Sequence, residues 1–424
     1  MQHLGSFSAA QRGFTSTVDE LAAFGGTPAV RKDLVTAWPA ASDLHLEALE
    51  TVIKSGRFHR VNHPIVAELE ERLAKWTNYW QFRAVATGTS AIHIALDRYK
   101  SGGRSVVTSA LNWPGALGPI HFAGLQPIFV DVTLEDATLD PVMAGQYLSQ
   151  DCASVLITHV FGNAAKLPAF RREVRRFGSV ALVDDCAQAI GAVVSQRSGE
   201  PLDSDAIAIS ANGAKHLGAG ELGLVCSRHA DLIDHVDRVS LTSSSRNGER
   251  VFSPMTQGYN YRPNVFSSAV ALSRMNTLDF QLAERRRNAA YVWSVLSSLP
   301  GLHPLFDAAN PDNSFLSLPL RIDCEVLDMP ASPATRDFIL DLLKAEGVPV
   351  CVWLTKPAFE YLPYWRNKWS IEDFPNTKLI LDTMFYISEI APPNDISVMR
   401  HYVDAFHKVW EALPSLRSQM TKRN

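Results

Sequence analysis

Residues 210–221 read Ser-Ala-Asn-Gly-Ala-Lys-His-Leu-Gly-Ala-Gly-Glu and directly follow the apolar run Ala206–Ile209. One lysine, Lys215, lies there among small residues, and glycines at three nearby positions predict a backbone that turns sharply and passes close to another group. A lysine that is desolvated on such a turn loses part of its preference for the charged form, so its amine can form a Schiff base with an aldehyde. The alternative is an ordinary lysine on a solvated surface, as most lysines are.

Short apolar runs alternate with segments of helical spacing between Phe82 and Ser227. This alternation predicts an α/β fold, with a largely parallel sheet covered by helices on both faces. Ligands bind such sheets beyond the carboxyl ends of the strands. The expected strands are Arg104–Ser109, Gln126–Val132, Ser154–Val160, Val180–Val183, Ala206–Ser210 and Leu222–Cys226, and the expected helices include Ser90–Tyr99 and Leu167–Arg176.

After Arg262 the pattern changes to a long helical stretch and then to mixed strands and helices, which is typical of a smaller α+β domain. We expect the run Arg285-Arg286-Arg287 to lie on a solvated helix face. The chain is therefore divided into an N-terminal arm (1–40), a large domain (41–290) and a small C-terminal domain (291–424). The elements expected after residue 262 are helices in Asn264–Ser298, Ala334–Glu346 and Ile396–Ala412, strands at Phe315–Arg321 and Val348–Trp353, and a loop at Asp307–Asn313.

Composition excludes several classes of function. The 424 residues are 46% hydrophobic and carry a formal net charge of -4, so a large basic surface for nucleic acid or an acidic membrane is not expected. No apolar run is long enough to span a bilayer. The five cysteines are widely spaced and form no CxxC pair, which predicts a cytoplasmic protein without a metal site.

Two further motifs could hold a phosphorylated, flat cofactor. Gly88-Thr89-Ser90-Ala91 opens a predicted helix, where hydroxyl groups and unpaired backbone N–H groups can bind a phosphate. A plain N-cap is the more frequent role of such a tetrapeptide. Trp113 follows the strand that ends near Ser109, where its indole could stack on a pyridine ring or could simply be buried.

The pair Asp184-Asp185 ends a buried apolar strand and is followed by Cys186-Ala187-Gln188. Acids at such a position are costly unless they are paired. Asp185 could keep a pyridine nitrogen protonated, which makes the ring an electron sink, whereas Asp184 could face a neighbouring element. A strand-end N-cap is an equally frequent explanation. With Lys215, these motifs indicate pyridoxal 5′-phosphate (PLP) as the cofactor.

In order and spacing the chain resembles the DegT/DnrJ/StrS family of PLP-dependent aminotransferases, which act on keto-sugars and keto-cyclitols. The resemblance covers about Leu21 to Glu411 and rests on six segments. These are Gly88-Thr89-Ser90-Ala91, Gln126–Val132, His159-Val160-Phe161-Gly162, Asp185-Cys186-Ala187-Gln188-Ala189, Ser210–Gly223 and Gly258-Tyr259-Asn260-Tyr261-Arg262. The resemblance implies fold type I, as in aspartate aminotransferase, with a seven-stranded large domain, and an obligate homodimer with shared active sites.

The resemblance also implies a role for each matching residue. Lys215 would bind the cofactor and shuttle a proton, and Asp185 would pair with the pyridinium. The cofactor-binding set would be Gly88, Thr89, Ser90 and Ser210 at the phosphate, Trp113 on the ring, Gln188 near the phenolic oxygen, and Asn260 reaching the phosphate of the neighbouring subunit. Dehydratase relatives carry histidine in place of the lysine, so Lys215 favours transamination from an amino acid, such as glutamate or glutamine, in antibiotic, other secondary-metabolite or polysaccharide synthesis.

Three segments depart from the family pattern: Asn62-His63-Pro64, Leu222 and Pro357-Ala358-Phe359. Because substrate contacts are expected there, the acceptor could be atypical. The opening Leu21–Arg31 resembles cyclitol aminotransferases and aminohydroxybenzoate synthases, which favours a ketone without a nucleotide. A PLP-dependent dehydratase or aromatising synthase on the same scaffold is the main alternative. A PLP-binding regulator would usually carry a DNA-binding module, and none is apparent in this sequence. A nicotinamide dehydrogenase would have a GxGxxG motif after its first strand, and this sequence has none there.

Overall fold

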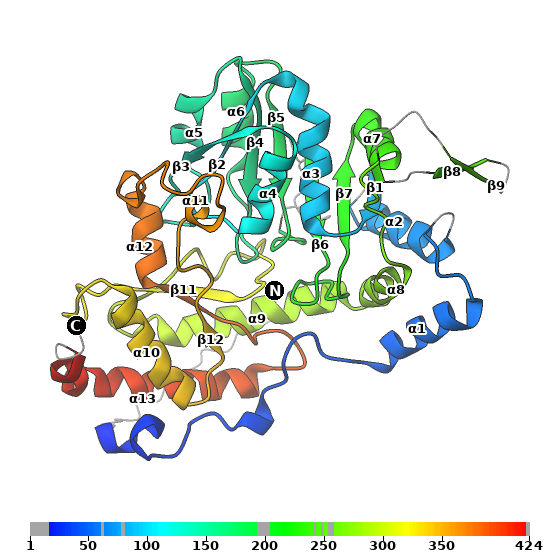
Figure 1. Cartoon of the computed structure of the whole chain (residues 1–424). Coiled ribbons are helices and arrows are strands. Elements are labelled where there is room, and N and C mark those ends of the chain that lie inside the picture. Colours follow the sequence, from blue (N-terminus) through cyan, green and yellow to red (C-terminus); the bar gives the residue numbers. More distant parts are fainter. Residues whose placement is uncertain are drawn as a thin grey trace, which may run out of the picture.

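A computed structural model describes residues 17–60, 63–77, 81–192, 204–240, 243–246, 249–252 and 258–420. Figure 1 shows two sheets that lie one above the other, with the helix α9 (Leu278–Leu296) running beneath the larger sheet. The first 16 residues of the predicted arm, and Asn62 of the first departing segment, lie outside the described residues.

The large sheet has seven strands in the order β1-β7-β6-β5-β4-β2-β3. Strands β2 to β6 run parallel to one another, and β7 is antiparallel to both of its neighbours. This confirms the predicted α/β fold. The strands are β1 (Gln81–Val85), β2 (Ser105–Ser109), β3 (Gln126–Val130), β4 (Cys152–Thr158), β5 (Ala181–Asp185), β6 (Ala206–Ser210) and β7 (Gly223–Ser227).

Helices cover both faces of this sheet because its central strands are buried on both sides. One hydrophobic cluster joins the sheet to α3, α4 and α7, and another joins it to α2, α5, α6 and α8. The bounds are α2 (Pro64–Trp76), α3 (Gly88–Tyr99), α4 (Pro114–Phe122), α5 (Pro141–Tyr147), α6 (Leu167–Val174), α7 (Ala230–Ser240) and α8 (Val265–Arg274). Helix α1 (Asp43–Ser55) packs on α8, and a short hairpin is formed by β8 (Ser243–Arg246) and β9 (Glu249–Phe252).

The C-terminal part forms an antiparallel sheet of four strands in the order β10-β11-β13-β12. Its core includes residues of α9, α10 and α13. This confirms the smaller α+β unit. The strands are β10 (Leu302–Pro304), β11 (Leu318–Ile322), β12 (Val350–Cys351) and β13 (Met384–Ile387), and the helices are α10 (Pro333–Ala345), α11 (Ala358–Tyr361), α12 (Pro375–Thr383) and α13 (Ile396–Met420).

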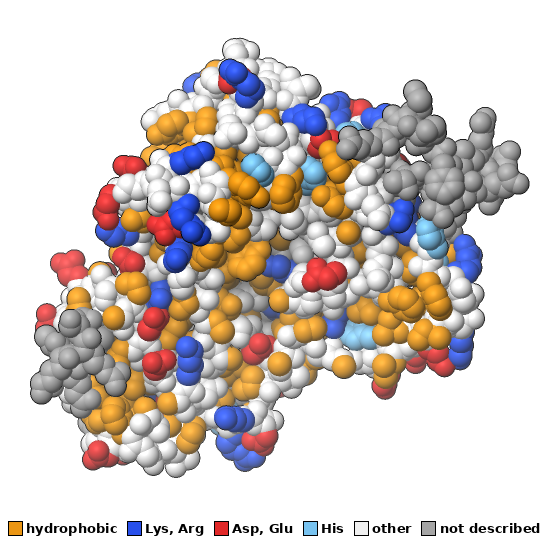
Figure 2. Space-filling view, in the orientation of Figure 1, with side chains coloured by type: hydrophobic (Ala, Val, Ile, Leu, Met, Phe, Trp, Pro, Cys, Tyr) orange, Lys and Arg blue, Asp and Glu red, His pale blue; other side chains and the backbone are white. Residues whose placement is uncertain are grey.

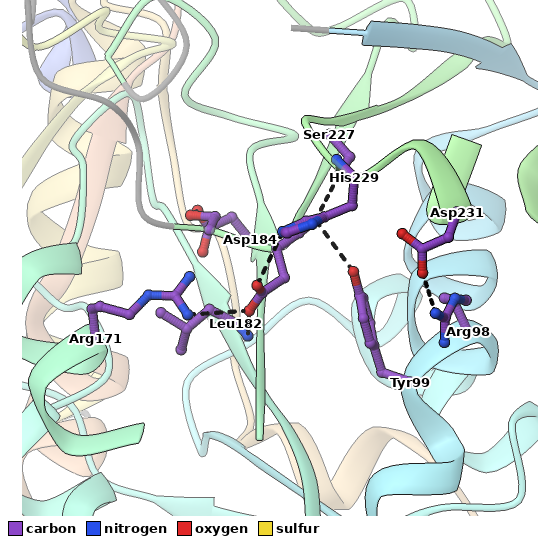
Figure 3. A network of polar contacts seen from close by, with 10 residues as sticks. Arg98, Tyr99, Arg171, Leu182, Asp184, Ser227, His229 and Asp231 are labelled. Atoms are coloured by element: carbon purple, nitrogen blue, oxygen red, sulfur yellow. Dashed lines mark hydrogen bonds and ion pairs between the residues drawn. The ribbon is translucent and has the colours of Figure 1, made fainter. Parts of the chain in front are cut away.

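Asp205 fixes the amino end of β6 against both of its neighbours. Its carboxylate accepts a hydrogen bond from the backbone N–H of Leu182 at 2.7 Å and lies 3.4 Å from the guanidinium of Arg171. Its backbone carbonyl accepts from the hydroxyls of Ser227 at 2.7 Å and Tyr99 at 3.4 Å (Figure 3). These bonds fix the position of β6 along β5. Lys215 lies in the turn that follows the carboxyl end of β6.

The N-terminal arm lies along the small domain (Figure 1). The buried carboxylate of Glu346 accepts hydrogen bonds from the backbone N–H groups of Ala22 at 2.7 Å and Ala29 at 2.9 Å. The Lys408 ammonium lies 2.9 Å from the same carboxylate and donates to the carbonyl of Thr27. Charge-assisted bonds of this kind are stronger than neutral ones, so Glu346 anchors the arm.

One expectation about this part of the chain is wrong. Arg285 does not lie on a solvated face, because its side chain is buried and donates to the carbonyls of Phe315 at 3.2 Å and Leu316 at 2.7 Å. Arg286 is partly buried and donates to the carbonyl of Asn313, whereas Arg287 is exposed and pairs with Glu284. Only the last arginine of the run fits the prediction.

Candidate active site

Lys215 lies on a tight turn that follows β6. Its backbone N–H donates to the carbonyl of Asn212 at 2.8 Å, and its own carbonyl accepts from the N–H of Gly218 at 2.9 Å. Gly218 and Gly220 have φ values of +37° and +89°, which favour glycine because it has no Cβ. The sequence-predicted sharp turn is thus present. Among the described residues, no group accepts a hydrogen bond from the Lys215 ammonium.

Three side chains from distant segments hold this turn by its carbonyl oxygens. The indole Nε1 of Trp38 donates to Lys215 at 3.0 Å, Gln281 donates to His216 at 3.0 Å, and Arg274 donates to Gly218 at 3.0 Å. The buried ring of His216 contacts the carbonyl of Ser314 at 3.2 Å. Sequence reasoning missed these supports, because nothing near Trp38 or Gln281 in the chain indicates a partner so far away.

The two acids at the end of β5 face different surroundings. One carboxylate oxygen of Asp185 accepts from the N–H of Ala187 at 3.0 Å, beyond the carboxyl end of the strand. Asp184 is fully buried, accepts from the hydroxyl of Ser204 and lies 3.7 Å from Nε2 of His159. Since successive side chains of a strand point to opposite faces, Asp184 is directed at a neighbouring element.

Asp185 ends β5, and Lys215 follows the neighbouring strand β6. The charge of each residue affects the pKa of the other. Burial raises the pKa of the Asp185 carboxyl, an effect that the Lys215 charge partly offsets. Burial lowers the pKa of the Lys215 ammonium, and Asp185 partly offsets that shift. They form no direct ion pair within the described part of the chain. A lysine with a lowered pKa is available as a nucleophile or base, and such shifts are concentrated at functional sites.

Gln188 lies on the turn that follows Asp185. Its side-chain oxygen accepts from the backbone N–H of Phe161 at 2.9 Å. This bond orients the amide, so its NH₂ group is left to donate elsewhere. Phe161 and Gly162 are fastened to the small domain, because their carbonyls accept from the N–H groups of Leu316 and Ser314.

The start of α3 meets the end of β6. A Cβ on Gly88 would lie 2.8 Å from the Cβ of Ser210, which shows how closely the two backbones approach. The hydroxyl of Ser90 is already used in a capping box, donating to the carbonyl of Thr87 at 2.7 Å and accepting from its N–H at 2.9 Å. The hydroxyl of Ser210 accepts from the N–H of Asn212 at 3.2 Å. Thr89 is exposed at the same helix end.

Trp113 is the N-terminal residue that flanks α4, and its side chain is 53% exposed. The alternative of an ordinary buried tryptophan is therefore wrong. A Cβ on Gly115 would lie 2.8 Å from Nε1 of Trp113 and 3.1 Å from Oγ1 of Thr89. Glycine at 115 thus lets the indole and the start of α3 come together on one side of the sheet.

Asn260 lies in an extended connection before α8 and is exposed. Its φ of +59° is in the left-handed region, which asparagine tolerates better than most residues. Its neighbour Tyr261 accepts from the N–H of Ala86, just before the start of α3. No contact in the described chain joins Asn260 to Lys215 or Asp185.

Two departures from the family pattern have structural roles. Ala358 and Phe359 are fully buried, and the Phe359 ring packs against Phe129, Trp369 and Phe374. The expected substrate contact at Ala358-Phe359 is therefore wrong. Leu222 is fully buried as well. Glycine is required only at the next position, because a Cβ on Gly223 would lie 2.1 Å from the carbonyl oxygen of Thr87.

Over the described ranges, no cluster of three histidine, cysteine or acidic side chains is arranged to hold a metal ion. None of the helices described is both long and apolar enough to cross a membrane.

A seven-stranded, mostly parallel sheet with a small antiparallel domain is the architecture of the fold type I aminotransferases. The chain belongs to the DegT/DnrJ/EryC1/StrS aminotransferase family, whose model matches residues 40–390. It is therefore an enzyme of an aminotransferase family that depends on PLP.

Three similar proteins illustrate the relationship. An L-glutamine:2-deoxy-scyllo-inosose aminotransferase from Streptoalloteichus tenebrarius is 28% identical over 350 residues, which cover 74% of this chain and 80% of that protein. The crystal structure of 3-amino-5-hydroxybenzoic acid synthase matches with a TM-score of 0.77 and 21% identity, covering 89% and 100% of the two chains. The PMP form of a putative sugar aminotransferase, Spr1654, from Streptococcus pneumoniae matches with a TM-score of 0.78 and 15% identity, covering 90% and 99%.

Proposed function

We propose that this protein is a PLP-dependent aminotransferase that moves an amino group from glutamate or glutamine to a keto-sugar or keto-cyclitol. The observation that carries the proposal is the placement of the partly buried Lys215 and the buried Asp185 after the ends of adjacent parallel strands, where the charge of each affects the pKa of the other. The named relatives support the choice of substrate class, since several are L-glutamine:2-deoxy-scyllo-inosose aminotransferases. A pathway to an antibiotic or a related metabolite fits that choice.

The residues at the carboxyl ends of the strands suit the parts of PLP. The start of α3 at Gly88 and Thr89, with the hydroxyl of Ser210, would form a cradle for an anion, whereas the N–H and hydroxyl of Ser90 both donate to Thr87 within the helix cap. The half-exposed indole of Trp113 can cover a flat ring, and the NH₂ group of Gln188 can donate to a phenolic oxygen.

When bound, PLP supplies an aldehyde that accepts amino groups and a ring that takes up negative charge. Asp185 would hold a proton at the ring nitrogen. Lys215 would bind the aldehyde carbon through Nζ and afterwards move the proton at the substrate carbon. The backbone of the lysine turn is held in place because its carbonyls accept hydrogen bonds from Trp38, Gln281 and Arg274.

The decisive experiment uses the half-reaction. Purified protein loaded with PLP and given one amino acid should convert the cofactor to pyridoxamine phosphate, which absorption spectra detect. A ketone panel should then restore PLP. A dehydratase or aromatising synthase would leave PLP unchanged with every amino donor and would release water from its substrate. Borohydride reduction followed by peptide mass spectrometry should place the cofactor on Lys215, and Lys166→Ala is a surface control.

We also infer a homodimer with shared active sites, to which Asn260 contributes. Figure 2 shows hydrophobic side chains gathered over α1 and α8, and the exposed apolar residues there include Leu44, Leu46, Ile53 and Phe58. Mixing the inactive variants Lys215→Ala and Asn260→Ala should restore activity, because one site of each mixed dimer is then intact. Sedimentation would report the dimer itself.

A cytoplasmic location stays a prediction, based on cysteines that are all free in the structure.

A further inference from the structure

Trp38 connects three parts of the molecule that are far apart in sequence. Its indole Nε1 donates to the carbonyl of Lys215 at 3.0 Å. Its backbone N–H donates to the carboxylate of Glu389, which follows β13 of the small domain, at 2.8 Å. One residue of the N-terminal arm is therefore bonded to the lysine turn and to the small domain at once.

The arm is fastened next to Trp38 as well. The side chain of Asn394 accepts from the N–H of Thr36 at 2.9 Å and donates to its carbonyl at 2.8 Å. Asn394 is buried, and its own carbonyl accepts from Asn288 on α9 at 2.8 Å. Residues 36–38 consequently have a fixed position on the small domain.

Two buried arginines lie over the indole ring. The guanidinium carbons of Arg274 and Arg285 are 4.7 and 4.9 Å from the centre of the Trp38 ring. Arg285 is 1% exposed, and its Nη2 has no hydrogen-bond partner in the described structure. An aromatic face attracts a cation, so the indole compensates two like charges that would otherwise repel each other. The same arginines bind the carbonyls of Gly218 and Phe315.

We propose that Trp38 is a positioning residue for Lys215. Its indole N–H binds the lysine turn and its backbone N–H binds Glu389, so the position of the turn is coupled to that of the small domain. This proposal rests on the catalytic role proposed for Lys215. The carbonyl of Lys215 accepts from both Trp38 and Gly218. Loss of the indole bond leaves the Lys215 carbonyl with the N–H of Gly218 alone, while Gln281 and Arg274 still hold the carbonyls of His216 and Gly218.

The first test uses cofactor-free protein and therefore does not depend on activity. Trp38→Phe keeps an aromatic ring near Arg274 and Arg285 and removes the indole N–H donor. Hydrogen exchange should become about tenfold faster for the peptide that contains residues 213–219, because the turn opens more often. Trp410→Phe is the matched control, since Trp410 also donates its indole N–H to a backbone carbonyl, that of Pro300, at 2.9 Å, remote from Lys215.

The second test separates positioning from general stability. In the half-reaction with an amino acid, Trp38→Phe should lower the maximal rate constant about tenfold with little change in the half-saturating amino acid concentration, because the misplaced lysine slows proton transfer after the donor has bound. Glu389→Gln, which weakens the other end of the connection, should give a smaller change in the same direction and covers the case that Trp38→Phe fails to fold. Hydrogen exchange and a maximal half-reaction rate constant equal to those of Trp410→Phe would overturn the proposal. If wild-type protein shows the slow exchange but never binds PLP at Lys215, the proposed function fails while the structural coupling stands.

Discussion

Gly88 and Ser210 are in such close contact that a methyl group on Gly88 would lie 2.8 Å from the Cβ of Ser210. This contact joins the start of α3 to the end of β6, and it places a helix N-terminus beside the lysine turn. We predict that Gly88→Ala forces the two segments apart, destabilises the fold by about 1–3 kcal/mol and weakens PLP binding at least about tenfold. Thermal unfolding and a cofactor titration measure the two effects.

Gly118→Ala is the control for this substitution. Gly118 lies in α4, where a Cβ would meet only the ring of Phe122 at 3.6 Å, and alanine favours a helix more than glycine does. Its melting temperature and cofactor affinity should therefore stay at or above the wild-type values. Equal affinities for the two alanine variants would show that the Gly88–Ser210 contact does not shape the phosphate site.

The adjacent acids of β5 should have different roles. Asp185→Asn removes the carboxylate beyond the strand and should lower the half-reaction rate by about 10²- to 10⁴-fold with the fold preserved. Asp184→Asn removes a fully buried carboxylate that accepts from Ser204 and faces His159, so it should mainly lower stability. Rates and urea unfolding of both variants are the measurements. If Asp184→Asn lost more activity than Asp185→Asn, the assignment would be reversed.

Much of the large sheet could be predicted from sequence because its strands β4 to β7 are short runs that are buried along their whole length. Ala206–Ser210 has the predicted bounds, and Gln126 is the predicted start of β3. β1 was missed as a defined strand, because Gln81 and Arg83 interrupt its apolar pattern at the edge of the sheet. β12 has only two residues and β10 only three, which is too short for a period of two to be recognised.

The candidate residues themselves could be found because motifs of the large domain are local in sequence. What surrounds Lys215 could not be found that way. Trp38 is 177 positions away from Lys215, and the burial of Arg285 depends on carbonyls of residues 315 and 316 that only the small domain supplies. A run of three arginines is usually solvated. Here the first of them is needed inside, where backbone carbonyls and an indole face surround its charge.

Glu346 should be important for stability and not for chemistry. Glu346→Gln keeps the size of a fully buried side chain but removes the charge that binds Lys408 and two backbone N–H groups of the arm. The variant leaves the partly buried Lys408 ammonium with only the Thr27 carbonyl and weakens two bonds to the arm, so we expect a loss of about 1–3 kcal/mol in urea unfolding. Glu68→Gln on the exposed side of α2 should change stability by less than about 0.5 kcal/mol. A Glu346→Gln variant as stable as Glu68→Gln would contradict the anchoring role.

Burial of an ammonium at position 215 should cost stability in the cofactor-free protein, and the cost should depend on pH. Because burial lowers the pKa of Lys215 in the folded state, the unfolded chain binds more protons between that pKa and 10.5. Stability therefore rises with pH in this window, and below the folded-state pKa the full cost of the buried charge is present. Lys215→Met, which has no charge to bury, should be more stable than wild type at about pH 7, and this advantage should shrink towards about pH 10. Urea unfolding at both pH values tests it, with Lys54→Met at an exposed ion pair as the control. An advantage that is absent at pH 7, or that grows with pH, would mean that the amine is not desolvated, and the turn would then have no reason to make Lys215 reactive.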